Sequence, residues 1–355
     1  MADAGLSRGG TQGSTRFSAN PLALAFFTLF AALVALIAVI ALTGKTSDGE
    51  PSVTLALTPQ QGFPQQVVAP KTAGLRLVNG NLVADPALIE KTAAGPLPMI
   101  AANGRKPMTA YGGPFNGADT RPRIAVVIGG LGLSPGATKL ALDHLPSAVT
   151  LSFAPYASDL QRWVDAARGR GHEVLIEVPM EPFDYPASDP GPKTLLIAAG
   201  EKDNAKRLFW VLSRCTGYVG ATNLLGGRFL SNANAIEPVL GELARRGLMF
   251  FDNSASGLSA AAAAAERANA PIAAGAVVLD AEQRHESIGA RLAELETRAR
   301  ENGAATASGI VYPVTIQAVT QWAAGVEKRG FVLAPITAVI AQGKTTTEET
   351  TPPAE

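Results

Sequence analysis

Short apolar runs alternate with longer amphipathic stretches between residues 121 and 342. Strand-length runs that alternate with helix-period stretches predict a parallel sheet covered by helices, because strands buried on both faces are apolar throughout. Eight such runs favour an irregular parallel β/α barrel over 121–342, and a doubly wound open sheet is the alternative. The expected strands are Ile124–Ile128, Val149–Phe153, Glu173–Val178, Tyr218–Thr222, Leu248–Phe251, Ala276–Leu279, Ala304–Gly309 and Val332–Pro335, and the clearest expected helices are Asp159–Arg170, Lys202–Arg214, Ala235–Arg246 and Glu286–Glu301.

An unbroken apolar stretch, Leu22–Leu42, precedes this region and contains no charged residue. Its length matches the roughly 20 apolar residues that span a bilayer as a helix. A cleaved signal peptide, which usually has a shorter apolar run, and a buried core helix are the alternatives. Residues 1–21 carry two arginines against one aspartate. The positive-inside rule therefore predicts a cytoplasmic arm at 1–21, a single-pass anchor at 22–42 in the inner membrane, and a periplasmic C-terminal domain.

Prolines recur between the apolar stretch and the expected barrel. Residues 43–74 are rich in Pro, Thr and Gln, a composition that cannot bury enough apolar surface to fold alone, and they predict a tether. Residues 75–120 contain more apolar positions, such as Leu77, Leu82 and Ile89. They predict an extended arm that packs on the barrel, with a wholly disordered tether as the alternative. The polar residues 343–355 predict a disordered tail.

Composition narrows the classes of function. The chain of 355 residues has 47% hydrophobic and 17% charged residues, which excludes wholesale disorder. Its 30 basic and 30 acidic residues cancel. A chain without a net basic field is a poor partner for nucleic acid. The single cysteine, Cys215, excludes an internal disulfide and a thiolate metal cluster.

Polar side chains gather where the expected strands end. In β/α barrels the chemistry lies at the carboxyl ends of the strands, so carboxylates and amides there describe a cleft for a polar ligand such as a sugar. Helix capping is the competing explanation, above all for the three residues 252–254. Glu177 differs because apolar residues flank it, and a carboxylate in an apolar strand must be paired, protonated or functional. The candidate catalytic residues are Glu177 and Asp252, and the candidate ligand-binding residues are Glu181, Asn223, Arg228, Asn253 and Tyr312.

Several short motifs follow one another in order along the expected barrel. They are Ile128-Gly129-Gly130-Leu131-Gly132, Gly171-His172-Glu173-Val174, Pro179-Met180-Glu181-Pro182, Pro190-Gly191-Pro192, Asn223-x-x-Gly226-x-Arg228-Phe229 and Phe251-Asp252. Together they resemble the divergent polysaccharide deacetylase family over roughly residues 121–340. The resemblance implies an irregular β/α barrel and metal-assisted hydrolysis of an N-acetyl group. In that chemistry a divalent metal polarises the amide carbonyl and activates water, while a carboxylate acts as base.

The departures from the family pattern fall on its chemical positions. The family has two aspartates at the first strand end, where this chain has Gly129 and Gly130. It has histidines at three further positions, which are Glu177, Leu224 and Ile310 in this chain. Two acids and three imidazoles that the resemblance implies are therefore absent.

The remaining side chains are poor replacements for these ligands. Zinc takes about three nitrogen, sulfur or oxygen ligands from the protein. Glu177, Glu181 and Asp252 supply oxygen only, which would favour Mg or Ca, and His172 precedes the third expected strand at the opposite edge. The sequence therefore predicts no metal cofactor, with an all-oxygen divalent site as the alternative.

Three functions remain open. The first is a membrane-anchored, deacetylase-like protein of envelope carbohydrate metabolism that binds cell-envelope glycan with weak or absent catalysis. The second is an active metal-dependent N-deacetylase, a hydrolase of carbon–nitrogen bonds, with a rearranged carboxylate site. The third is a glycoside hydrolase with Glu177 and Asp252 as acid and base, which requires the two carboxyl groups about 5–10 Å apart.

Overall fold

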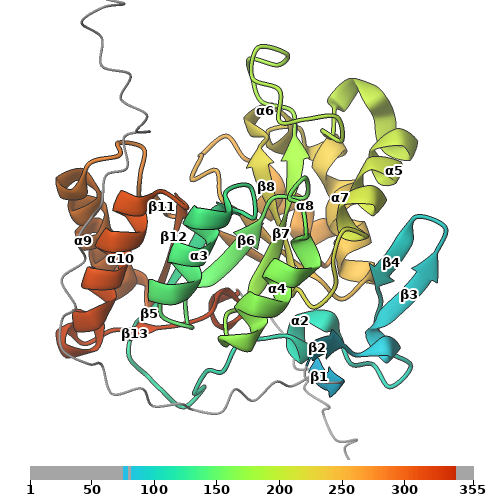
Figure 1. Ribbon diagram of the computed structural model, residues 1–355. Helices are drawn as coiled ribbons and strands as arrows, with labels where there is room; N and C mark the ends of the chain where they lie inside the picture. Colours follow the sequence, from blue (N-terminus) through green and yellow to red (C-terminus); the bar gives the residue numbers. More distant parts are fainter. Residues whose placement is uncertain (1–74, 79–80, 341–355) are drawn as a thin grey trace, which may run out of the picture. The chain divides into compact units, whose positions relative to one another are not determined.

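The computed structural model describes residues 75–78 and 81–340. A nine-stranded sheet lies at its centre, with every strand pair parallel (Figure 1). The strands lie in the order β10-β9-β8-β7-β6-β5-β12-β11, and β13 pairs with the start of β5. Their bounds are β5 Arg123–Leu131, β6 Thr150–Phe153, β7 Val174–Met180, β8 Gly220–Leu225, β9 Met249–Asp252, β10 Ile272–Ala274, β11 Val277–Val278, β12 Ala304–Ile310 and β13 Val332–Leu333.

Helices connect the strands and cover the outer face of the sheet. Their apolar side chains share one buried cluster with alternate strand residues, such as Ile124, Val126 and Ile128 of β5. Parallel strands need such crossovers, because a tight turn can join only antiparallel neighbours. The helices are α3 Pro135–His144, α4 Leu160–Gly169, α5 Gly200–Leu212, α6 Gly227–Leu230, α7 Ala233–Arg245, α8 Ala261–Arg267, α9 His285–Asn302 and α10 Pro313–Val326.

The sheet curls until its two edges meet on one segment of chain. β10 pairs with β9, and β11 pairs with β12, yet only Gly275 and Ala276 separate β10 from β11. The Gly275 N–H donates to Asp252 O and the Ala276 N–H donates to Thr306 O. The sheet is therefore a curled half-barrel bridged by one extended segment.

The inner face of the sheet is closed at its amino edge by residues from outside the barrel. Ala125, Val127 and Leu175 point inward and pack with Leu88 and Tyr111 in a second buried cluster. The elements that bring these residues there are two antiparallel hairpins and a short helix: β1 Leu75–Val78, β2 Asn81–Ala84, β3 Ile89–Thr92, β4 Gly95–Pro98 and α2 Pro107–Ala110.

A buried glutamate also ties this edge together. The carboxylate of Glu173 accepts hydrogen bonds from the Gly113 N–H at 2.7 Å, from the Thr337 N–H at 3.1 Å and from the Thr337 hydroxyl. Burial raises the pKa of Glu173. The side chain of Glu173, the residue just before β7, therefore holds the segment before β5 and the segment after β13 against the bottom of the sheet.

The predicted α/β class with a parallel sheet under helices is confirmed, and each of the eight expected strands is present. β10 was not predicted, because its three residues have no apolar run of strand length. Within the described ranges 75–78 and 81–340, no helix is long and apolar enough to cross a membrane. The predicted anchor at 22–42, the whole tether at 43–74 and the tail at 343–355 lie outside these ranges.

Glycine at position 220 is required by the close approach of two strands. A Cβ there would lie 2.3 Å from Met249 O and 2.5 Å from Met249 Cγ. We expect Gly220→Ala to lower the free energy of unfolding by about 1–3 kcal/mol or more, because the backbone of β9 must move. Denaturant unfolding measures this change.

Gly241, inside α7, is the matched control, since no atom lies within 4 Å of a Cβ built there. Gly241→Ala should stabilise the protein by up to about 1 kcal/mol through helix propensity. Equal effects of the two substitutions would contradict the packing described for β8 and β9.

Candidate functional site

Glu177 lies near the end of β7 with its carboxyl group on the inner face of the sheet. Its Oε1 accepts hydrogen bonds from the Gly130 N–H at 2.6 Å and from the Ser152 hydroxyl at 2.7 Å. Its Oε2 is buried without a hydrogen-bond partner, and the residue is 4% exposed. Burial raises the pKa of this carboxyl, so the neutral form is favoured.

The absence of a side chain at Gly129 leaves the space that the Glu177 carboxyl group occupies. A Cβ at position 129 would lie 2.8 Å from Glu177 Oε1 and 3.2 Å from Ser152 Oγ. The carboxyl group of Glu177 therefore occupies space next to the position where the family resemblance implies an aspartate. Ser152 was not singled out from the sequence, although a hydroxyl between Leu151 and Phe153 in a buried strand was a usable signal.

Glu181 and Arg228 meet above the ends of β7 and β8. Glu181 is 6% exposed, and its Oε1 lies 3.0 Å from Arg228 Nη1 while its Oε2 accepts from the Ile197 N–H at 2.7 Å. The Arg228 side chain is 52% exposed. The structure thus brings two predicted ligand-binding residues together, with a guanidinium that presents further donors to solvent.

Asn223 and Asn253 form a closed amide pair across β8 and β9. The side chain of Asn223 donates to Asn253 Oδ1 at 2.7 Å and accepts from the Asn253 N–H at 3.0 Å. The side chain of Asn253 in turn donates to Asn223 O at 2.7 Å. These bonds fix the ends of the two strands and use much of the hydrogen-bonding capacity that the sequence interpretation assigned to a ligand.

Asp252 is not brought together with Glu177. The strand register aligns Glu177 with Thr222 and Thr222 with Phe251. Aligned residues of parallel strands share a face, so Asp252, one residue farther on, points to the opposite face. There its Oδ1 accepts from the Ser254 N–H at 3.0 Å and its Oδ2 from the Ser259 hydroxyl at 2.5 Å. The two carboxyl groups therefore do not face each other across the sheet, which the predicted acid–base pair would require.

Tyr312 precedes α10 and is partly exposed. Its N–H donates to Ile310 O at 2.7 Å. Asp280, the carboxylate that lies closest to this turn, accepts from the Ile310 N–H at 2.6 Å and from the Thr315 hydroxyl at 2.8 Å. The roles of Tyr312 in ligand binding and of Glu177 and Asp252 in catalysis stay predictions.

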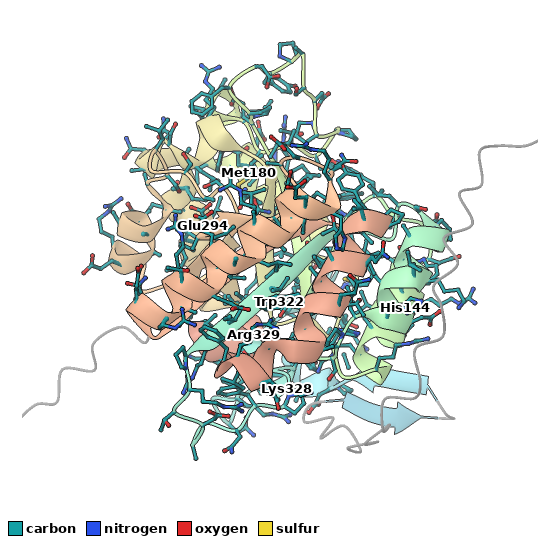
Figure 2. The ribbon with its side chains drawn as sticks, turned by 90° about the vertical axis from the view of Figure 1, so that its left-hand side faces the viewer. His144, Met180, Glu294, Trp322, Lys328 and Arg329 are labelled. Atoms are coloured by element: carbon teal, nitrogen blue, oxygen red, sulfur yellow. The ribbon has the colours of Figure 1, made fainter. Side chains whose placement is uncertain are left out.

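Two of the three histidines, His144 and His172, lie away from this edge. His172 is buried at the amino edge, its Nδ1 is 2.8 Å from Val149 O, and burial lowers its pKa to about 4. His144 ends α3, and Figure 2 shows it well separated from Met180, the last residue of β7. Neither imidazole can reach the carboxyl edge of the sheet.

Comparison with known proteins places the chain in a family. A model of the divergent polysaccharide deacetylases matches residues 126–340, more than half of the chain. This protein belongs to the divergent polysaccharide deacetylase family. It is 28% identical over 200 residues to the uncharacterized protein YibQ of Escherichia coli K12, a match that covers 56% of this chain and 61% of YibQ. The matched region thus spans less than two thirds of that relative.

Solved structures are similar as well. The crystal structure of an uncharacterized protein from Agrobacterium tumefaciens is 39% identical, with a TM-score of 0.67, and the match covers 69% of this chain and 99% of that one. The catalytic domain of a peptidoglycan N-acetylglucosamine deacetylase from Eubacterium rectale is 16% identical, with a TM-score of 0.39, over 61% of this chain and 91% of that one.

The side chains of this family member do not fit the metal that the family implies. No group of three or more His, Cys, Asp and Glu side chains in residues 83–340 is arranged to hold a metal ion. Two of the substituted positions, Leu224 and Ile310, are aliphatic, and Ile310 Cγ2 lies 3.5 Å from a Cβ built on Gly130. Glu181, Asp252 and Asp280 are each engaged by protein donors. No reaction step through a metal follows from this arrangement.

The raised pKa of Glu177 predicts a particular dependence of stability on pH. Because burial raises this pKa above its ordinary value of 4.5, the stability that the neutral carboxyl contributes is fully present below pH 4.5 and is lost as the pH rises through the folded pKa. We expect Glu177→Gln, which stays neutral, to lose this part of the pH dependence. Urea unfolding of both proteins across acidic to alkaline pH measures it.

Glu173 titrates in both proteins, so its contribution cancels in the difference between them. The advantage of the wild type over the variant should therefore shrink as the pH rises. Two stability profiles that run parallel over the whole pH range would show that the Glu177 carboxyl does not titrate as described.

Proposed function

We propose that this deacetylase-like protein is anchored in the inner membrane, carries an irregular barrel of the deacetylase type in the periplasm, and binds envelope glycan with weak or absent catalysis. The observation that carries this proposal is the carboxyl group of Glu177, which fills space beside Gly129 and accepts two protein donors. Membership of the family and the apolar stretch Leu22–Leu42 support it further.

A cleft beside the Glu181–Arg228 pair suits a polar ring with one apolar face. Its volume is about 570 Å³, within the range of small-molecule sites. Carbohydrate recognition needs amides and charged donors for hydroxyl groups together with an aromatic surface for the ring face. The cleft is lined by Phe183, Ile197, Arg228, Ser231, Asn232, Ala233 and Asn234.

A smaller hollow continues this cleft between α5 and α7. Its volume is about 250 Å³, and it shares Ile197, Asn232 and Asn234 with the cleft. A ligand of more than one sugar unit would therefore find continuous surface along the two helices.

Isothermal titration of the full-length protein with N-acetylated glycan fragments tests the binding function. We expect binding, and we expect Arg228→Ala to weaken it about tenfold, because a charged hydrogen bond contributes roughly 1.5–3 kcal/mol. Arg298→Ala is the matched control, since Arg298 is a similarly exposed arginine on α9 that pairs with Glu294. Figure 2 labels Glu294. Absence of binding to every fragment, or equal effects of the two substitutions, would count against the proposal.

Catalysis is tested separately by metal content and acetate release. We expect purified protein to carry no stoichiometric transition metal, and we expect no acetate release that a chelator abolishes. Stoichiometric metal together with chelator-sensitive acetate release would instead establish the alternative, an active N-deacetylase with a rearranged carboxylate site. The glycoside hydrolase alternative has no support, because Glu177 and Asp252 face opposite sides of the sheet.

A further inference from the structure

Exposed apolar side chains are concentrated at one end of the domain. Among residues 83–340 the large hydrophobic side chains that are exposed number six, and five of them lie at or just after the carboxyl ends of parallel strands. Parallel strands end at a common edge, so these five side chains share it. They are Leu133 after β5, Phe183 after β7, Leu225 at the end of β8, Leu258 after β9 and Ile310 at the end of β12, with exposed fractions of 61%, 61%, 49%, 69% and 40%.

Four of these side chains stand on loops that contain no charged residue. The loops are Gly132–Ser134, Leu225–Gly227, Asn253–Ala260 and Ile310–Tyr312, which we name the uncharged rim. In the whole chain 17% of residues are charged. Phe183 does not belong to the uncharged rim, because its loop also carries Asp184 and because its side chain lines the cleft.

Contacts between the loops make the uncharged rim continuous. The Val311 N–H donates to Gly129 O at 2.9 Å, which joins the end of β12 to that of β5. The Ser308 hydroxyl donates to Asn253 O at 3.4 Å, and Asn223 donates to both Asn253 and Leu225 O at 2.7 Å. The four loops thus extend from strand ends that hydrogen bonds connect along one edge of the sheet.

The backbone of the rim is held in an uncommon conformation. Leu225 has φ 57° and Ala255 has φ 47°, values that favour glycine. The Leu225 side chain, which is 49% exposed at such a position, gains only part of the stabilisation that full burial would give. Strained positions of this kind concentrate at functional sites.

We propose that the uncharged rim rests on a lipid surface, with Leu133, Leu225, Leu258 and Ile310 inserted among the lipids. Loops without charge enter the boundary between headgroups and acyl chains without the cost of removing an ion from water. Because these loops carry no charge, they offer a protein partner no ionic contact that would fix its orientation on the rim.

The length of chain before the domain permits this contact. The predicted anchor ends at Leu42, and the 32 residues 43–74 reach at most about 110 Å when fully extended. The nine residues of β5 span only about 30 Å. Either end of the domain can therefore reach the bilayer, and the anchor would keep the rim at high effective concentration near it. The proposal does not depend on glycan binding.

A label on the rim tests the proposal in the full-length chain. The only native cysteine, Cys215, is buried, so Leu258→Cys can be labelled selectively with an environment-sensitive fluorophore. Val83→Cys is the matched control, because Val83 is 41% exposed in β2, at the far end of the domain from α6 (Figure 1). Both labelled proteins are reconstituted in phosphatidylcholine–phosphatidylglycerol vesicles with brominated acyl chains.

We expect several-fold stronger quenching at position 258 than at position 83, and we expect Leu133→Ser with Ile310→Ser to reduce the quenching at 258. Equal quenching at both positions, or failure of the chain to sediment with the vesicles, would overturn the proposal. Self-quenching of the label at 258 that depends on protein dilution and not on bromine would also overturn it, and would assign the rim to a contact between two copies of the chain. A change in the fluorescence of the label at 258 that appears only when another protein is added would also overturn the proposal, and would assign the rim to a contact with that protein.

Discussion

The carboxyl group of Glu177 joins the ends of three neighbouring strands, and the chemistry of the carboxyl edge depends on it. One oxygen on β7 receives a donor from β5 and a donor from β6, through Gly130 and Ser152. Only glycine at position 129 leaves space for this arrangement. Position 177 and position 129 are thus coupled sterically, and a side chain cannot be added at one without displacing the other.

A second buried glutamate, Glu173, lies just before the other end of β7. Glu173 and Glu177 lie four residues apart on the same face of the strand, separated by about 13 Å of chain. Burial raises the pKa of both carboxyl groups. Glu173 holds the chain segments that close the amino edge, whereas Glu177 holds the strand ends around the former chemical positions of the family. The interior of the half-barrel therefore has at each end a buried carboxyl group whose pKa is raised, and an apolar layer between them, formed in part by Leu175.

The sequence was sufficient to predict the sheet because burial on both faces imposes apolar runs that local pattern reveals. It was not sufficient to predict the site. The alignment of β7, β8 and β9 determines that Glu177 and Asp252 lie on opposite faces of the sheet, and the sequence does not reveal that alignment. The importance of Glu177 could be predicted from its apolar neighbours. The donor Ser152, by contrast, lies 25 residues away in sequence, and only the strand order brings it to Glu177.

Hydrogen bonds that cap strand ends explain why several predicted ligand-binding side chains serve the fold first. Asn223 and Asn253 bind each other, and Asp252 binds the turn that follows it. Among the predicted site residues, Arg228 keeps donors directed to solvent, because Glu181 engages only one edge of its guanidinium. A polar residue at the end of a strand is therefore a more reliable sign of a strand-end hydrogen bond than of a role in ligand binding or catalysis.

The absence of the two acids that the family pattern has at the end of β5 changes the electrostatics of this edge. Two carboxylates at the end of β5 would repel each other in a partly buried edge unless a cation lay between them. With Gly129 and Gly130 in their place, the end of β5 carries no acid, and the carboxyl group beside it is that of Glu177, whose pKa burial raises and whose Oε1 accepts two protein donors. The end of β5 then has no pair of carboxylates whose repulsion a cation must offset. The aliphatic side chains at positions 224 and 310 therefore do not lie beside such an unshielded pair. The absence of these two acids makes an uncharged, apolar rim compatible with a stable fold.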